Sequence, residues 1–164
     1  LPLWVDTIEL VKKEIPNIKC VMVGDGERFN DIKGRIYSKG LEKNIELAGR
    51  KDNVNEYIEK SKLLLMTSKS EGLPMVVVEC MALGTPVVVP DVGDINDLVI
   101  NRKNGIIVNT RNPEDFAKEI LNLLNNKRMY EELSRECILS IQEMEKSSSH
   151  SEIVKLWNNM LSKI

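Results

Sequence analysis

The chain of 164 residues is 42% hydrophobic and 29% charged, and its formal net charge is −2. These values are typical of one soluble globular domain with a sizeable core, and they offer no basic surface for nucleic acid and no polybasic patch for a membrane. No apolar run approaches the ~20 residues that a transmembrane helix needs, and there is no signal-peptide pattern. Three cysteines stand far apart in apolar settings, which indicates reduced core thiols in a cytoplasmic protein rather than disulfides or a metal site: Cys20, Cys80 and Cys137.

The first half of the chain alternates helical and strand patterns, and the first pattern starts almost at Leu1. Because residue 1 is not methionine, we expect the chain to be part of a longer protein. Apolar residues at helical spacing predict a helix over 3–15, and the short β-rich run 18–24 predicts a buried strand. The predictions that follow are a helix from Phe29 to Gly40, a strand over 45–49, a short helix over 53–60 and a strand over 62–68.

The second half continues the alternation. Residues 74–83 predict a helix that is buried on most sides, because Pro74 suits a helix start and Gly84 is a stop signal. Asn112 and Pro113 fit the cap and first position of another helix, which runs to about residue 124. The remaining predictions are strands over 85–91 and 105–109, a short helix over 94–100, and helices over about 127–145 and 149–163.

Strands that alternate with helices predict an α/β fold with a Rossmann-like, doubly wound parallel sheet and additional C-terminal helices. In such a sheet the loops at the carboxyl ends of the strands meet at one edge, where ligands bind. Four loops with glycine or charge fall on that edge of the predicted sheet: Gly24 to Gly26, Arg50 to Asp52, Ser68 to Leu73, and Asp91 to Asp94.

Two glutamates eight positions apart flank the start of the predicted helix 74–83. The free N–H groups at a helix start favour phosphate, and Gly72 permits a close approach of the backbone. Glu79 lies among apolar residues farther along the helix, where a carboxylate accepts both hydroxyls of a ribose. Glu71 stands at the helix mouth beside the place for a sugar. The arrangement therefore predicts a nucleotide-sugar site.

The segments "EGLPMVVVE" and "MALGTPVVVPDVGD" resemble the paired-glutamate signature of retaining glycosyltransferases with the GT-B fold, and the chain is most similar to glycosyltransferase family 4. The likeness covers nearly the whole chain, including "VMVGDGE", "NGIIV" and "NPEDFAKEILNLL". It implies the donor-binding half of an enzyme for polysaccharide or glycoconjugate synthesis, without the acceptor-binding half and without the first strand of this half.

The resemblance also implies a role for each site residue. Glu79 holds the ribose, and Glu71 is the catalytic residue beside the donor sugar. Arg50 and Lys51 border the base. The backbone of Gly72, Leu73, Pro74 and Met75 contacts the sugar and the distal phosphate, and the remaining donor-binding candidates are Gly24, Gly26 and Ser68.

The implied substrate is a nucleoside-diphosphate sugar, with no metal and no cofactor. The acceptor is a saccharide or lipid that the missing N-terminal half binds, and that half also provides a peripheral membrane association. The isolated chain is expected to transfer no sugar. Two departures from the family pattern affect the sugar pocket, since Asp94 replaces a usual glycine and Asn96 a frequent proline.

Simpler interpretations remain open. Glu71 fits a solvated acid near a helix start, Glu79 fits a structural ion pair, and Arg50 with Lys51 fits ordinary surface charge. Gly24 and Gly26 fit a tight turn. Two other functions are a Rossmann-type dinucleotide-binding module, which lacks its third glycine here because position 29 is Phe, and a non-catalytic α/β interaction domain.

Overall fold

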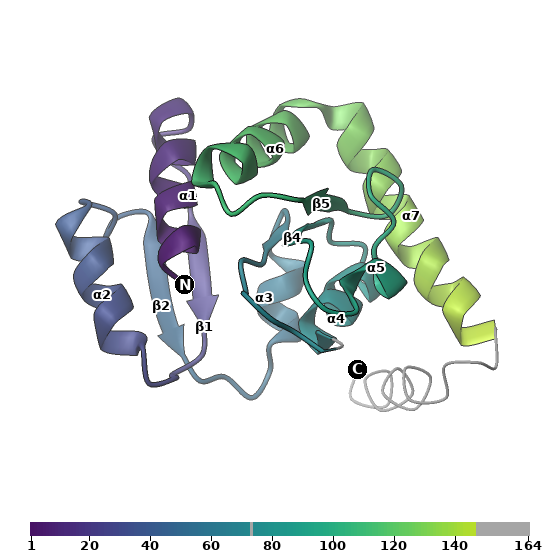
Figure 1. The fold of residues 1–164 in the computed structure, drawn as a ribbon, viewed down its shortest axis with the longest axis horizontal. Helices are drawn as coiled ribbons and strands as arrows, with labels where there is room; N and C mark the ends of the chain where they lie inside the picture. Colours follow the sequence, from purple (N-terminus) through teal and green to yellow (C-terminus); the bar gives the residue numbers. More distant parts are fainter. Residues whose placement is uncertain (73, 147–164) are drawn as a thin grey trace.

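The computed structural model describes residues 1–72 and 74–146, and it confirms the alternation of helices with parallel strands (Figure 1). The strands are β1 Cys20–Val23, β2 Ile45–Gly49, β3 Leu64–Leu65, β4 Val87–Pro90 and β5 Ile106–Val108. The helices are α1 Pro2–Glu14, α2 Phe29–Ser38, α3 Asn55–Glu59, α4 Met75–Ala82, α5 Ile95–Leu98, α6 Pro113–Asn125 and α7 Lys127–Lys146. The predicted helix over 149–163 lies outside the described residues.

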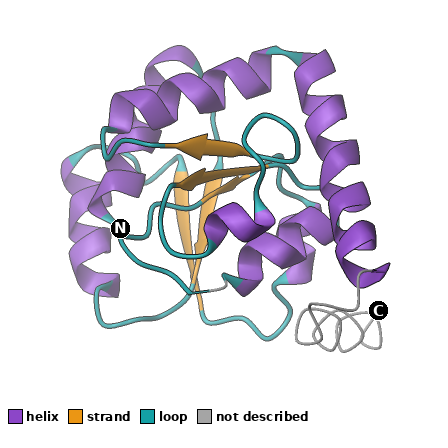
Figure 2. Cartoon of the chain, turned by 45° about the vertical axis from the view of Figure 1, so that its right-hand side comes forward, coloured by secondary structure: helices purple, strands orange, loops and turns teal. Residues whose placement is uncertain are grey.

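The parallel strands form two sheets. β1 pairs with β2 from Cys20 opposite Ile45, and β4 is the middle strand of a sheet with the order β3-β4-β5. Within residues 1–72 and 74–146, β1 and β3 are not paired with each other. Figure 2 shows the strands of the two sheets running in clearly different directions. The parallel α/β architecture is confirmed, but the sheet is divided between β1 and β3.

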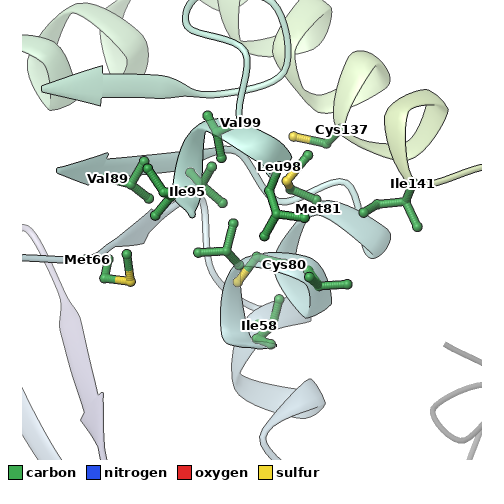
Figure 3. Close-up of a cluster of buried hydrophobic side chains, with 13 residues drawn as sticks. Ile58, Met66, Cys80, Met81, Val89, Ile95, Leu98, Val99, Cys137 and Ile141 are labelled. Carbon is green, nitrogen blue, oxygen red and sulfur yellow. The ribbon is translucent and has the colours of Figure 1, made fainter. Parts of the chain in front are cut away.

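Strand β4 is the middle strand of the three-stranded sheet, and helices cover both of its faces. Val87 and Val89 face a core that α3, α4, α5 and α7 share, and Figure 3 shows this cluster. Val88 faces the opposite core with Val11 of α1 and Phe116 of α6. All four residues of β4 are buried. A strand buried on both faces needs a continuous apolar run, which explains the sequence of this segment.

Helix α1 packs in the cores of both sheets. Val11 packs in the core of β4 and α6, while Trp4, Val5 and Ile8 pack against Ile32 of α2 in a third core. Pro2 suits the first turn of the helix because it needs no amide donor there. One helix thus contributes apolar side chains to cores on both sides of the division between the sheets.

Two strands differ from the prediction. The run 62–68 forms a strand only at Leu64 and Leu65, and the run 18–24 narrows to Cys20–Val23. All residues of β1 and β3 are half-buried, so the expectation of a buried strand at 18–24 is wrong for this structure. The physical reason is that each strand has a pairing partner on one side only.

The last helices follow the sequence signals closely. Asn112 caps α6 and accepts a hydrogen bond from the Glu114 amide at 3.5 Å, with Pro113 at the first position. Asn104 is fully buried and fastens the loop before β5 to α7, since its amide donates to the Ser140 hydroxyl at 2.9 Å. No helix in the described part of the chain is both long enough and apolar enough to span a membrane.

Candidate functional site

The helix that was predicted over 74–83 is α4, and it begins at Met75. Pro74 is the N-cap residue, one position earlier than predicted, because its backbone is extended at φ −77° and ψ 101°. Val77, Val78 and Met81 are fully buried, which explains why β-branched residues are tolerated in this helix. The Val77 amide donates to the Pro74 carbonyl at 2.9 Å, and the amides before it in the first turn have no intrahelical partner.

Glu79 lines a cavity of about 1440 Å³ and is half-buried. Burial raises the pKa of its carboxyl group above the ordinary glutamate value. Among residues 1–72 and 74–146 the carboxylate makes no ion pair and no hydrogen bond. This argues against the structural ion pair that the sequence left open. A desolvated carboxylate without a protein partner retains its capacity to accept hydrogen bonds from a ligand.

Glu71 lines the same cavity from the loop between β3 and α4. Its backbone is held by the loop after β4, where Gly93 has φ +56°. A Cβ atom at position 93 would lie 1.8 Å from the Glu71 carbonyl oxygen, so only glycine permits this approach. Glu71 likewise has no ion pair among the described residues. Two of the four predicted loops are therefore in direct contact.

Arg111 lines the cavity and was not predicted from the sequence. It follows β5 and donates from Nη2 to the Thr67 carbonyl at 2.8 Å and from Nη1 to the Ser68 carbonyl at 2.5 Å. It therefore fixes the loop after β3 while its guanidinium remains on the cavity wall. Its position at the carboxyl end of the last strand was the available signal, because that end belongs to the ligand-binding edge.

Five further basic residues line the cavity together with Arg111: Lys19, Arg28, Lys60, Lys62 and Lys69. These charges give the cavity wall a positive potential, and Val76 in the first turn of α4 also lines the cavity. Both features favour an anion such as phosphate.

The predicted site residues fall into two groups. Ser68, Glu71 and Glu79 meet at the cavity. Leu73 lies outside the described residues. The others do not belong to the wall of this cavity: Gly24, Gly26, Arg50, Lys51, Gly72, Pro74 and Met75.

The second group occupies the loops around the same edge. The Gly24 amide donates to the Gly49 carbonyl at 2.8 Å, which joins the loops after β1 and β2, and Gly24 has φ +131°. Gly26 is exposed and accepts from the Phe29 amide at 2.8 Å. Arg50 and Lys51 are exposed. The Gly26 contact forms a turn, and the Gly24 contact joins two distant segments of the chain. The ligand contacts of this group remain predictions.

The three thiols are not reactive groups. Burial raises the pKa of Cys20, Cys80 and Cys137 to about 12, so they stay protonated near neutral pH. All three are free thiols. Across the described ranges, no group of three or more His, Cys, Asp or Glu side chains is placed to hold a metal ion.

Comparison with known proteins agrees with this geometry. Residues 3–138 match the family described as Glycosyl transferases group 1. The poly(ribitol-phosphate) alpha-N-acetylglucosaminyltransferase of Staphylococcus aureus is 31% identical over 161 residues, which are 98% of this chain and 32% of that protein. The uncharacterized glycosyltransferase MJ1178 of Methanocaldococcus jannaschii is 37% identical over 110 residues, 66% of this chain and 31% of that protein. The chain thus spans about a third of the length of these curated relatives.

Solved structures show the same fold. A mutant of S. aureus TarM in complex with Fondaparinux, alpha-GlcNAc-glycerol and UDP has a TM-score of 0.83 and 30% identity, covering 96% of this chain and 31% of that one. The C-terminal domain of the Francisella tularensis group 1 protein LpcC has a TM-score of 0.76 at 16% identity, covering 87% of this chain and 77% of that one, and supports the fold alone. By its sequence and its fold, this chain belongs to the glycosyl transferases group 1 family.

Proposed function

We propose that this chain binds the nucleoside-diphosphate sugar donor of a retaining glycosyltransferase, which transfers a hexose-type sugar to a saccharide or lipid acceptor. The observation that carries the proposal is the pair Glu71 and Glu79, which line one cavity without ion-pair partners among the described residues, Glu71 just before α4 and Glu79 within it. A similar protein with 30% identity has UDP in its crystal structure. Family membership favours this function over a dinucleotide-binding module, and the open glutamates favour it over a non-catalytic interaction domain.

Each part of the donor has a proposed partner. The Glu79 carboxylate accepts hydrogen bonds from the ribose hydroxyls, and Glu71 lies beside the donor sugar. The amides at the start of α4 receive the distal phosphate, and Arg111 adds positive charge at the same mouth. Arg50 and Lys51 border the base.

Transfer breaks the bond between the anomeric carbon and the phosphate oxygen and forms a bond from the acceptor hydroxyl oxygen to the same carbon, on the same face. The hydroxyl proton leaves with the diphosphate. Positive side chains and the helix start stabilise the negative charge on that leaving group, without a metal ion.

The whole enzyme is needed for turnover in this proposal. The acceptor is held by an N-terminal half, which also supplies a peripheral association with the membrane, and residues 1–164 alone transfer no sugar. The three free thiols agree with a reducing cytoplasmic location.

Titration calorimetry of the complete protein against a panel of nucleoside diphosphates and their sugars tests this function. One nucleoside diphosphate is expected to bind, and Glu79→Gln is expected to weaken it by about 10-fold or more, because charged hydrogen bonds to the ribose are lost. Glu143→Gln, an exposed change on α7, is the matched control and should leave affinity unchanged. The proposal is wrong if no member of the panel binds, or if both variants bind like the unaltered protein.

A further inference from the structure

The loop between β3 and α4 leaves the sheet early, and it carries Glu71. The Met66 amide still donates to the Val88 carbonyl at 3.0 Å, and Figure 3 shows the Met66 side chain in the same core as Val89. At its end β4 offers the loop no further amide, because Pro90 is the last residue of the strand and has no amide hydrogen. The carbonyl groups of the loop therefore need hydrogen-bond donors from elsewhere.

Arg111 provides two of these donors. Its Nη2 donates to the Thr67 carbonyl at 2.8 Å, and its Nη1 donates to the Ser68 carbonyl at 2.5 Å. The guanidinium group is planar and rigid, so two of its N–H groups on two consecutive carbonyls form a fork. The fork fixes the direction of the loop backbone as well as its distance from Arg111.

This fork reaches across the three-stranded sheet. Arg111 follows β5, whereas Thr67 and Ser68 follow β3, and β4 lies between those two strands. The outer strands of the sheet are not ladder partners, so a backbone ladder cannot make this connection. One side chain thus ties their carboxyl ends together at the edge where Glu71 and Glu79 line the cavity.

The backbone that carries Arg111 is itself fixed on both sides. The Thr110 hydroxyl donates to the Asp115 carboxylate at 2.5 Å and accepts from the Asn112 amide at 3.3 Å. Asn112 also caps α6. Arg111 therefore extends from a rigid base, which a residue needs if it is to hold another segment in place.

Arg111 directs its hydrogen bonds to backbone carbonyls and not to the carboxylates of the cavity. Arg111, Glu71 and Glu79 all line the cavity. Within residues 1–72 and 74–146, however, no ion pair joins the guanidinium to either glutamate. An arginine bound to Glu71 would occupy the oxygen atoms that a ligand needs. The observed arrangement holds the loop by its backbone and leaves that carboxylate without a cation partner.

The loop has a second support, closer to Glu71. The Glu71 carbonyl lies so close to Gly93 that only glycine fits at position 93. Arg111 holds the beginning of the loop at Thr67 and Ser68, and Gly93 borders it three residues later. Glu71 is thus placed from two sides, by the segments that follow β5 and β4.

We propose that Arg111 is a positioning residue for sugar transfer, which holds the loop after β3 so that Glu71 lies beside the donor sugar. The inference rests on the proposed function, because it needs a donor in the cavity. The fork places the loop, and the positive charge is a separate contribution to the site. Lysine keeps the charge at this position but has no planar fork, so Arg111→Lys separates the two.

Hydrolysis of nucleotide sugars by the complete protein, with water as the acceptor, tests this role. The probes are UDP-glucose, UDP-N-acetylglucosamine, GDP-glucose and ADP-glucose, and the release of nucleoside diphosphate is measured. Arg111→Lys is expected to lower kcat about 10-fold or more and to change KM less than about 3-fold, because a misplaced group at the reacting centre is costly while the charge near the phosphates is kept. Arg111→Gln should lower kcat as much and also raise KM, because it removes the charge.

Arg128→Lys on α7 is the matched control, since Arg128 is exposed and pairs with Glu132 on the same helix. It should leave both constants unchanged. Full activity of Arg111→Lys, whether or not Arg111→Gln is impaired, shows that the fork has no role in transfer and overturns the proposal. If the unaltered protein neither binds nor hydrolyses any nucleotide sugar, the proposed function fails, and this inference fails with it.

Limited proteolysis of the same variants examines the loop without a ligand. Lys69 is exposed and follows Ser68 directly, so trypsin cleavage after Lys69 measures opening of the loop. Arg111→Lys is expected to speed this cleavage about 10-fold, because opening the loop no longer breaks the fork. Cleavage after Lys118, within α6, should stay unchanged as a control for the global fold. Unchanged cleavage after Lys69 contradicts the proposal, and equal acceleration at both sites shows general destabilisation and contradicts it as well.

Discussion

Strands β4 and β1 have similar sequences and opposite environments. Val87, Val88 and Val89 of β4 have no exposed surface, while every residue of β1 is half-exposed. The difference arises from the neighbours, because β4 has a strand on each side and helices on both faces, whereas β1 has a strand on one side. The burial of a parallel strand is therefore a property of the whole sheet, and an apolar run shows only what the strand is suited for.

A charged residue introduced into each strand should give the largest difference in stability between β4 and β1. In residues 1–164, Val88→Asp is expected to lower the free energy of unfolding by about 3–5 kcal/mol, because it leaves an uncompensated buried charge. Val21→Asp should cost only about 1 kcal/mol, since solvent reaches that side chain. Chemical denaturation measures both values. Equal costs of the two substitutions would contradict the difference in burial between the strands.

The glycines of the loops after β4 and β1 give a second comparison. In Gly93→Ala the alanine would have to adopt a φ of +56°, and its methyl group would collide with the Glu71 carbonyl. We therefore expect a loss of about 2 kcal/mol in the free energy of unfolding, and weaker donor binding. Gly26→Ala has no atom within 4 Å of its new Cβ and should be close to neutral in stability. Thermal unfolding with and without nucleotide distinguishes them. Equal effects of the two changes would contradict the contact between the loops.

Glu79 lies on the wall of the cavity, and its substitution should give a small change in stability. Its pKa is raised in the folded state, so ionisation at neutral pH opposes folding. Glu79→Gln is thus expected to raise stability at pH 7 by less than about 1 kcal/mol, discounted because solvent still screens the group. The gain should disappear as the pH falls below the ordinary carboxyl pKa, where both states hold the proton. Denaturation at several pH values checks this, and a gain that grows on acidification would contradict it.

Sequence patterns predicted the helices better than the strands. Caps and stop signals located α4 and α6 to within a residue, because those signals act through local hydrogen bonds. The run 62–68 has the composition of a long strand but pairs over only two residues, since strand length depends on distant neighbours. The division of the sheet was not predictable from alternation alone.

The acidic residues of the candidate site were predicted from the sequence, and its basic residue Arg111 was not. Glu71 and Glu79 were predicted because burying a carboxylate among apolar residues costs free energy unless it has a binding partner. Arg111 gave no such signal, since a lone arginine after a strand is common on surfaces. Its contacts with Thr67 and Ser68 depend on the loop after β3, which is 43 residues away in sequence for Ser68.

Helix α1 has a consequence for synthesis on the ribosome. Val11 packs against Phe116 and Leu123, so its core partners exist only after α6 has been translated. At 5–20 residues per second, that delay is roughly 5–20 s. During this interval the surface of α1 around Val11 is available to chaperones or to other nascent chains, whereas Trp4, Val5 and Ile8 already have Ile32 of α2 as a partner.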